Sequence, residues 1–592
     1  MASKVCLKCR ILSQSIVSSK RFYSKPAVNH QKQKPNDAAA PQTRISPKSI
    51  SIQQIQYKSG RKNIPRLSYD LDRVLFNPGV YYLQDPRSRV YNFDPYLQNI
   101  MSVEEFDYNA LGEYITSSRD TILDKLAREN DCSFVGSTSS MTAVLAHFHY
   151  LLSSWRPIDI EPLSSEFADL YRTFTQTQRA PAAVFLRHRD GVYAIDADKS
   201  CETGDTILSA LGKSMEKLLT MPSHEFEKFR RGKSHLLDSS VRNMPEAYNY
   251  CKYNSMLMRS QLDCQDPRLP GTGVFDLKTR AVVAVRMDVR NSEEASGYQI
   301  KTSTGLFESF EREYYDMIRS AFLKYSLQVR IGNMDGIFVA FHNTERIFGF
   351  QYIGLDEMDY RVHGKGGSIL AEQEFKFSIS LLHDLLQQIR SELPGQSVRI
   401  HVETRETRVP SLYIFAEAME EETIEKLQQG AIEQILSKVS GEPVVKSVLE
   451  EKRLSKSDQG SRINNADESA AKVKQQNPSP SDVSKIRGWQ LTVTQYVNGV
   501  ETRDPPEVGP KTKWEIVPKL TPIESDKVLS KYEACKLRRI KLLGEDDPST
   551  ATSQWSDQFR RTLQDLARRG RKELEERGEV DNPIVWKSTH TH

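Results

Sequence analysis

The segment that most constrains the fold is a pair of apolar runs separated by a turn. Residues 256–264 and 274–287 are rich in hydrophobic side chains, and their connection contains Pro267, Pro270 and Gly271. Proline and glycine clustered between apolar runs are typical of a turn between two strands. The sequence therefore predicts two neighbouring antiparallel strands.

The register of this predicted hairpin brings three charged side chains to one face. Side chains two apart on a strand share a face, so Asp276 and Lys278 emerge side by side. With the turn centred between Leu269 and Pro270, Asp263 stands opposite Asp276, at the roughly 5 Å that separates cross-strand partners. Two carboxylates at that spacing repel each other unless a cation lies between them.

These charges predict a divalent metal site. Mg²⁺ and Mn²⁺ prefer carboxylate oxygens, and the bound ion lowers the pKa of a water ligand and polarises a phosphate. Lys278 would orient the attacking water or neutralise charge on the phosphate, and Leu277 offers a backbone carbonyl as a further ligand. The alternative is a surface ion pair between Asp276 and Lys278, with Asp263 in solvent.

The same spacing resembles that of the PD-(D/E)XK nuclease superfamily, in which an acid ends one strand and acid-x-Lys lies on the next. Asp263 matches the first acid, and Asp276-Leu277-Lys278 matches (D/E)XK. The resemblance implies an α/β fold with a mixed β-sheet flanked by helices. Superfamily members often add a metal-binding glutamate from an upstream helix. Glu246 is the preferred candidate because it opens the same block as the hairpin, and Glu216 is the second.

Longer blocks of the chain resemble the fungal mitochondrial RNA-processing family defined through petite mutants. The resemblance covers roughly residues 67–416, and its most specific blocks are residues 181–200, 214–220, 244–281 and 332–353. It implies a 5′→3′ exoribonuclease that trims the 5′ ends of mitochondrial transcripts and degrades them. It also implies single-stranded mitochondrial RNA and RNA-processing or degradation proteins as partners, and a matrix location, peripheral on the inner membrane.

Basic and aromatic residues near the hairpin are candidate RNA contacts, because single-stranded RNA binds through its phosphates and by stacking on aromatic rings. Arg280 shares the strand face of Lys278, and Tyr250 lies in a tyrosine cluster before the hairpin. Arg230 and Arg231 belong to a basic segment. A salt bridge for Arg280, a core position for the tyrosine and a solvated run of charges are the competing explanations.

Tyr315 is a further candidate by resemblance. Some relatives carry Gln-x-x-x-Tyr on the helix after the lysine strand, and Glu311 and Tyr315 have that spacing here, one helical turn apart. Glutamate replaces the glutamine, which is a departure from the family pattern.

The N-terminus has the composition of a targeting segment. Residues 1–23 contain five basic and no acidic residues, as in a mitochondrial presequence cleaved after Tyr23. A basic disordered tail that binds nucleic acid is the alternative. Loss of the presequence would change the formal net charge from +4 to −1. Global charge therefore does not argue for a nucleic-acid partner.

Composition shifts predict the remaining organisation of the chain. We expect a disordered arm at 24–65, a nuclease-like core at 66–440, a polar linker or insertion at 441–484 and a C-terminal extension at 485–592. In the extension, residues 489–497 alternate like a strand that would rejoin the main sheet, and the end of the chain forms a basic helix. The five cysteines outside the presequence are widely spaced and predict neither a zinc site nor a disulfide framework.

Apolar residues at helical spacing predict helices at residues 140–153, 206–221, 306–327, 375–392 and 421–436. The first of these helices carries His147 and His149. The two histidines are two residues apart, so they point to different faces and cannot share one metal ion.

Two other functions remain compatible with the sequence. A nuclease-derived RNA-binding adaptor would link transcripts to membrane-bound translation or to a degradation complex without cleaving them. A DNA exonuclease would use the same carboxylates and lysine, and the motif does not distinguish RNA from DNA.

Overall fold

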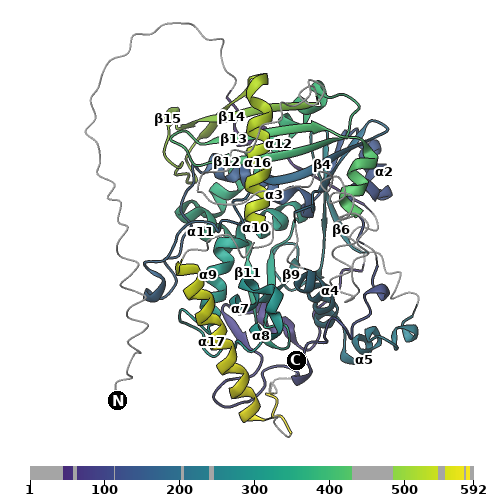
Figure 1. Cartoon of the computed structure of the whole chain (residues 1–592), viewed down its shortest axis with the longest axis vertical. Helices are drawn as coiled ribbons and strands as arrows, with labels where there is room; N and C mark the ends of the chain where they lie inside the picture. Colours follow the sequence, from purple (N-terminus) through teal and green to yellow (C-terminus); the bar gives the residue numbers. More distant parts are fainter. Residues whose placement is uncertain are drawn as a thin grey trace, which may run out of the picture. The chain divides into compact units, whose positions relative to one another are not determined.

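The computed structural model describes residues 44–57, 63–112, 114–201, 206–238, 246–429, 485–543, 554–578 and 582–586. The chain from Arg44 onward forms one compact unit. It contains two β-sheets flanked by helices, in agreement with the predicted α/β class (Figure 1). The predicted presequence and the linker at 441–484 lie outside the described residues.

The larger sheet has eleven strands in the described part of the chain. Ten follow one another in the order β1-β6-β7-β3-β5-β4-β12-β13-β14-β15, and β16 pairs with β14. Their bounds are β1 Gln53–Ile55, β6 Tyr248–Tyr253, β7 Met256–Gln261, β3 Phe134–Ser137, β5 Val192–Ala197, β4 Ala182–Arg189, β12 Val398–Arg405, β13 Ser411–Ala418, β14 Ile486–Val497, β15 Val500–Thr502 and β16 Trp514–Pro522. Strand β3 runs parallel to both of its neighbours, whereas the other pairs are antiparallel.

The smaller sheet carries the predicted hairpin. Its order is β2-β11-β10-β9-β8, with β9 and β10 parallel and the other neighbours antiparallel. Its strands are β2 Val80–Tyr82, β11 Ile347–Gly354, β10 Gly336–His342, β9 Val274–Ala281 and β8 Cys264–Gln265. A parallel pair needs a crossover connection, and the helices between β9 and β10 provide it.

Helices pack on both sheets. In the part of the chain that the structure describes, the helices longer than eight residues are α2 Thr121–Glu129, α3 Thr138–Leu152, α4 Thr206–Thr220, α9 Phe310–Ser320, α10 Phe322–Gly332, α11 Leu355–His363, α12 Gly367–Glu392, α16 Ser525–Leu543 and α17 Gln554–Arg577. The described ranges also contain the shorter helices α5 Ser223–Phe226, α7 Val283–Met287 and α8 Ser292–Ala295, together with ten 3₁₀ turns. Helix α16 contacts β12 and β14, and α17 contacts α7 and α8 (Figure 1).

Apolar periodicity explains the central helix α3. Ser137 caps it, with Ser140 completing the capping box, and thirteen of its fifteen residues are buried. A helix that is hydrophobic on all sides must be covered on all sides. It contacts α10, α12 and the strands β4 and β12, so it forms the centre of the main hydrophobic core.

Two predicted elements have different boundaries in the structure. The single helix expected at 306–327 is interrupted at Ala321, where α9 ends and α10 begins. The strand expected to reach residue 287 ends at Ala281, and α7 follows. The backbone N–H of Val283 donates to the buried carboxylate of Glu313 at 2.7 Å, which stabilises the start of that helix and overrides the β-branched sequence.

Residues 44–57 were assigned to the disordered arm from composition, and this assignment is wrong. They form the 3₁₀ turn Pro47–Ser49 and strand β1, which pairs with β6. The strand expected at 489–497 is confirmed, because β14 pairs with β13 and β16. Residues 421–429 are helical, and the rest of that predicted helix lies outside the described residues. None of the helices in the described ranges is long and apolar enough to cross a lipid bilayer.

Candidate active site

The chain crosses from one sheet to the other at Asp263. Strand β7 belongs to the larger sheet and ends at Gln261, and β8 begins at Cys264 in the smaller sheet. Cys264 pairs with Phe275, which is the register that the sequence predicts. The sequence predicted that residues 256–264 pair directly with residues 274–287. This prediction is wrong for β7, because only Cys264 and Gln265 of β8 pair with β9.

Asp263 lies where this register, extended by one residue, places it opposite Asp276. Its Oδ2 accepts a hydrogen bond from the backbone N–H of Leu277 at 3.0 Å, and the side chain is buried. The N–H and C=O of one residue in a strand point to the same edge. The carbonyl of Leu277, predicted as a metal ligand, therefore faces the edge at which Asp263 lies.

Asp276 and Lys278 form an ion pair on the predicted shared face of β9. Asp276 is fully buried, whereas 19 % of the Lys278 side chain is exposed. Helix α10 completes the surroundings, since Gln328 Nε2 donates to Asp276 Oδ1 at 3.0 Å and the ring centroid of Tyr325 lies 5.3 Å from Lys278 Nζ. Asp276 Oδ2 receives no well-aligned hydrogen bond.

Tyr325 and Gln328 were not identified from the sequence. They lie three residues apart, so an aromatic ring and an amide share one helix face. That pattern was the available signal. The helix is interrupted at Ala321, so the residues after this point face a different direction from the one that a continuous helix from residue 306 would give them. The assumption of one continuous helix therefore misplaces the residues that face β9.

The electrostatics of the two strand residues follow from burial. Burial, and then the nearby carboxylate of Asp263, hold the pKa of Asp276 well above its usual value, against the opposing effect of Lys278. Burial alone would lower the pKa of Lys278, but Asp276 and Asp263 outweigh it and raise that pKa. Lys278 is therefore a charged ammonium group at neutral pH.

Both candidate upstream glutamates lie near this cluster. Glu216 projects from α4, a helix that contacts β9, and about a quarter of its side chain is exposed. Burial, and then the carboxylates of Asp263 and Glu246, raise the pKa of Glu216 to about 7. Glu246 is exposed just before β6 and accepts a hydrogen bond from Tyr248 at 3.2 Å. Glu216 matches the helical position, although the sequence favoured Glu246.

The donor set fits a hard divalent cation. Asp263, Asp276 and Glu216 offer carboxylate oxygens, the ligands that Mg²⁺ and Mn²⁺ prefer, and Asp276 Oδ2 is buried without an aligned hydrogen bond. The ligand atoms of these three acids lie farther apart than those of a second set of side chains. Among the described residues, the ligand atoms that all lie within 4.8 Å of one another belong to His149, His363 and Glu374.

Arg280 on β9 and Tyr315 on α9 make structural contacts. Arg280 is buried with its Nε 3.9 Å from Glu313, and burial, then the neighbouring Arg286, lower the pKa of Arg280 to about 10. Tyr315 is buried and donates to the backbone carbonyl of Tyr171 at 2.9 Å. Neither side chain presents a free face to solvent in this structure.

The remaining RNA-binding candidates lie in different surroundings. Tyr250 is buried on β6, where its ring packs edge-on against Tyr57. Arg230 forms salt bridges with Glu227 at 3.0 Å and Glu105 at 2.9 Å. The backbone carbonyl of Phe106 accepts a hydrogen bond from Arg231 at 3.3 Å. Glu311, the partner of Tyr315 in the predicted motif, accepts hydrogen bonds from Ser164 at 2.6 and 2.9 Å.

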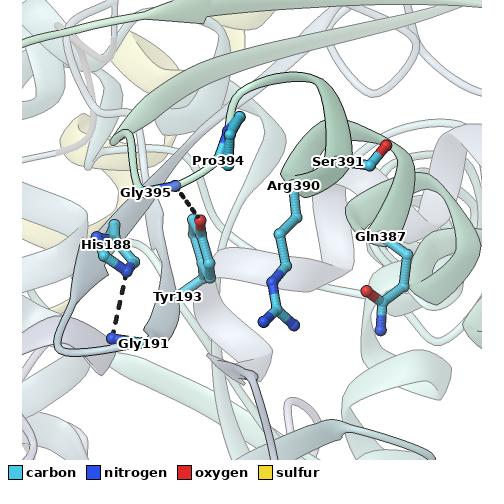
Figure 2. A pocket seen from close by; sticks show the side chains of 8 residues that line it. All are labelled: His188, Gly191, Tyr193, Gln387, Arg390, Ser391, Pro394 and Gly395. Atoms are coloured by element: carbon cyan, nitrogen blue, oxygen red, sulfur yellow. Dashed lines mark hydrogen bonds between the residues drawn. The ribbon is translucent and has the colours of Figure 1, made fainter.

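A separate pocket of about 360 Å³ lies between the β4–β5 turn and the C-terminal end of α12 (Figure 2). Tyr193 accepts a hydrogen bond from the backbone of Gly395 at 2.8 Å, and His188 accepts one from Gly191 at 3.2 Å. The guanidinium of Arg390 lies 5.9 Å from the ring centroid of Tyr193. The pocket shares no lining residue with the carboxylate cluster, so it does not extend the candidate active site.

The amino-acid sequence of the chain matches a known family. The family model of the mitochondrial protein Pet127 matches residues 114–387, a range that contains Glu216, Asp263, Asp276 and Lys278. The chain is 38 % identical over 367 residues to the mRNA degradation protein pet127, mitochondrial, of Schizosaccharomyces pombe, covering 61 % of this chain and 69 % of that protein.

A second relative is the putative mitochondrial translation system component PET127 of Saccharomyces cerevisiae. It is 38 % identical over 415 residues, which covers 59 % of this chain and 50 % of that protein. The chain thus spans about half the length of this relative and about two thirds of the other. On this similarity, the chain belongs to the Pet127 family of mitochondrial proteins.

Proposed function

We propose that this chain is a metal-dependent exoribonuclease that trims the 5′ ends of mitochondrial transcripts and degrades them. The observation that carries the proposal is the arrangement around Leu277. The carboxylate of Asp263 accepts a hydrogen bond from its backbone N–H, and the two residues beside it, buried Asp276 and partly exposed Lys278, form an ion pair. This arrangement supports the PD-(D/E)XK assignment that the sequence resemblance implies.

Mg²⁺ or Mn²⁺ would be held by Asp263 and Asp276, with Glu216 from α4 and the carbonyl of Leu277 as further ligands. When bound, such an ion lowers the pKa of a water ligand and neutralises charge on a phosphate. Asp276 is kept in place by the amide of Gln328, and Asp263 by the strand backbone. Both carboxylates are therefore oriented before metal or substrate arrives, which reduces the reorganisation that the reaction requires.

Lys278 acts as a charged donor and not as a base. Its raised pKa keeps the ammonium protonated, and the group carries three N–H donors. In this structure it lies against Asp276. With a cation on that carboxylate, the ammonium would be free to donate to a phosphate oxygen or to the attacking water, where it would stabilise the negative charge of the transition state.

The choice of RNA rests on relatives. One relative is named an mRNA degradation protein, and both relatives and the family model are described as mitochondrial. We extend these properties to this chain and propose single-stranded mitochondrial RNA as substrate. The 5′→3′ direction, a matrix location at the inner membrane and association with RNA-processing or degradation proteins follow from the family resemblance.

A non-catalytic RNA-binding adaptor is the second candidate. The name of the other relative, a putative mitochondrial translation system component, favours it. An adaptor would bind RNA without metal, and the ion pair of Asp276 and Lys278 would then only stabilise the fold.

The deciding experiment uses purified full-length protein and 5′-phosphorylated RNA labelled at one end or the other. The exonuclease predicts release of labelled mononucleotide from the 5′ label with Mg²⁺ or Mn²⁺, shortening of the 3′-labelled strand, and no reaction with a chelator. Metal-independent binding without cleavage would overturn the enzyme and support the adaptor. A matched single-stranded DNA distinguishes a DNA exonuclease.

A matched pair of variants ties activity to the site. Lys278→Ala removes the proposed donor. Lys199→Ala is the control, because Lys199 is an exposed lysine that directly follows an aspartate, without the intervening residue that separates Asp276 from Lys278. We expect only Lys278→Ala to abolish hydrolysis. Equal activity of both variants would reject the assignment of Lys278.

A further inference from the structure

A second group of metal-binding side chains lies in the main core, outside the carboxylate cluster. His149 projects from α3, His363 is the last residue of α11, and Glu374 lies on α12. One ligand atom from each lies within 4.8 Å of the other two. All three residues are at least 95 % buried, so solvent does not satisfy their polar atoms.

The contacts within the group leave two ring nitrogens without partners. His149 Nδ1 contacts one oxygen of Glu374, and His363 Nδ1 lies 3.6 Å from the other oxygen, beyond hydrogen-bond distance. The centroids of the two imidazole rings are 5.2 Å apart. His149 Nε2 and His363 Nδ1 have no hydrogen-bond partner. Buried polar atoms are satisfied in most native proteins, so two orphaned nitrogens in one group indicate a missing partner.

A donor from outside the group holds the carboxylate of Glu374. Arg156 Nη1 lies 3.5 Å from Glu374 Oε2 and so engages one oxygen of the carboxylate, leaving Oε1 on the side of His149. A carboxylate that is itself held by a donor is the usual surrounding of a metal ligand. Aromatic rings enclose the group, with the ring of Phe174 5.6 Å from His149.

We propose that His149, His363 and Glu374 form a Zn²⁺ site. Two imidazole nitrogens and one carboxylate oxygen are ligands that zinc accepts in a tetrahedral arrangement, in which an added water or solute occupies the fourth position. Mg²⁺ and Mn²⁺ favour oxygen donors, and the site therefore differs in preference from the carboxylate cluster at β9.

The position of the site indicates a structural role. His363 is followed by Gly364 and Gly367, both with positive φ, at the sharp connection from α11 to α12. A bound zinc ion ties this connection to α3. Helix α3 in turn contacts α10, which carries Gln328 and Tyr325 of the candidate active site. The metal thus stabilises the framework beneath that site without touching the reacting groups.

The test uses the full-length protein, stripped with a chelator and then given one equivalent of Zn²⁺. After desalting, elemental analysis is expected to give close to one zinc per chain, and the thermal unfolding midpoint is expected to rise by several degrees over the stripped protein. Zinc X-ray absorption should show nitrogen and oxygen ligands at about 2.0–2.1 Å and no sulfur at about 2.3 Å. Absence of bound zinc together with an unchanged midpoint would overturn the site.

Variants locate the ion. His149→Gln and Glu374→Gln should each retain less than about a tenth of the zinc. His383→Gln, on α12 and hydrogen-bonded to Ser255 at 3.0 Å, should retain it, as should Asp276→Asn in the candidate active site. The proposal is refuted if Asp276→Asn alone loses the zinc. It is also refuted if folded His149→Gln and Glu374→Gln retain the zinc, because the metal then binds elsewhere. If the two variants do not fold, the wild-type stoichiometry, midpoint and ligand spectrum decide the question.

Discussion

The carboxylate of Asp263 accepts a hydrogen bond from the backbone N–H of Leu277 at 3.0 Å. Asp263 directly precedes β8, and its side-chain oxygen, not a backbone carbonyl, accepts the hydrogen bond from this edge of β9. Because Leu277 lies between Asp276 and Lys278, this single bond fixes the first acid relative to the acid and lysine of the next strand.

Asp276→Asn should remove RNA hydrolysis while leaving the protein folded. The amide has the size of the carboxylate but not its charge, so metal binding and the release of Lys278 both fail. We expect a loss of about 10³-fold or more, comparable with the loss of a well-placed catalytic group. Single-turnover degradation of end-labelled RNA measures the loss, and the circular dichroism spectrum with the melting midpoint checks the fold. Activity within tenfold of wild type would contradict the assignment of Asp276.

Gln328→Ala should raise the metal concentration needed for half-maximal activity. Its amide donates to Asp276 at 3.0 Å and holds the carboxylate in place, and loss of such a supporting group typically costs about 10–100-fold in metal affinity or activity. Titration of activity with Mn²⁺ measures the effect. Gln387→Ala is the control, since that glutamine donates to Ser255 and not to the site. An identical titration curve for the two variants would exclude this role of Gln328.

Glu216→Gln should impair catalysis more than Glu246→Gln. Glu216 projects from α4 and its pKa is raised to about 7 by burial and then by Asp263, whereas Glu246 is exposed before β6. We expect at least about a tenfold difference in activity at a limiting Mg²⁺ concentration, the lower end of the effect of groups that support a metal. The reverse order would identify Glu246, the residue that the sequence favoured, as the metal ligand.

His342→Asn should make the stability of the protein less sensitive to acid. Burial lowers the pKa of His342 from 6.5 to about 3, so the folded state keeps the neutral ring while the unfolded state takes up a proton. The stability that this histidine contributes is present above pH 6.5 and is lost as the pH falls toward 3. Between pH 6 and pH 4, the free energy of unfolding of wild type should fall about 1.4 kcal/mol per pH unit more steeply than that of the variant.

Urea unfolding at pH 6, 5 and 4 measures this difference in slope. Asparagine at position 342 can still accept the hydrogen bond that His342 Nδ1 receives from the backbone of Thr344 at 3.1 Å. The variant is expected to be less stable at pH 7, because the smaller side chain leaves space in the core. Parallel pH profiles would show that the folded protein protonates His342 as readily as the unfolded chain does, and would contradict the lowered pKa.

Arg259→Met should destabilise the larger sheet by about 3–5 kcal/mol, because it leaves the buried carboxylate of Asp120 without its cation. Asp120 also accepts hydrogen bonds from Ile122 and Leu123 at 2.9 Å and caps α2. Adding Asp120→Asn removes the unpaired charge and keeps the cap, so the double variant should recover part of the loss. Urea unfolding measures both, and a double variant less stable than Arg259→Met would contradict this account.

The sequence by itself determined the local elements and one register. Helical spacing located α3, and parity along β9 placed Asp276 and Lys278 on one face. The Pro-Gly turn set the pairing of Cys264 with Phe275, which brings Asp263 opposite Asp276. These features depend on interactions between residues close in the chain, and composition and periodicity record such interactions directly.

Only the tertiary structure decided which distant residues join them. Gln328, Tyr325 and Glu216 reach β9 from helices whose packing depends on the whole core, and the break at Ala321 sets the orientation of α10. The sequence also did not predict that β7 and β8 belong to two different sheets. His149 and His363 are 214 residues apart, and no spacing rule connects them, because long-range contacts arise from the burial of many side chains at once.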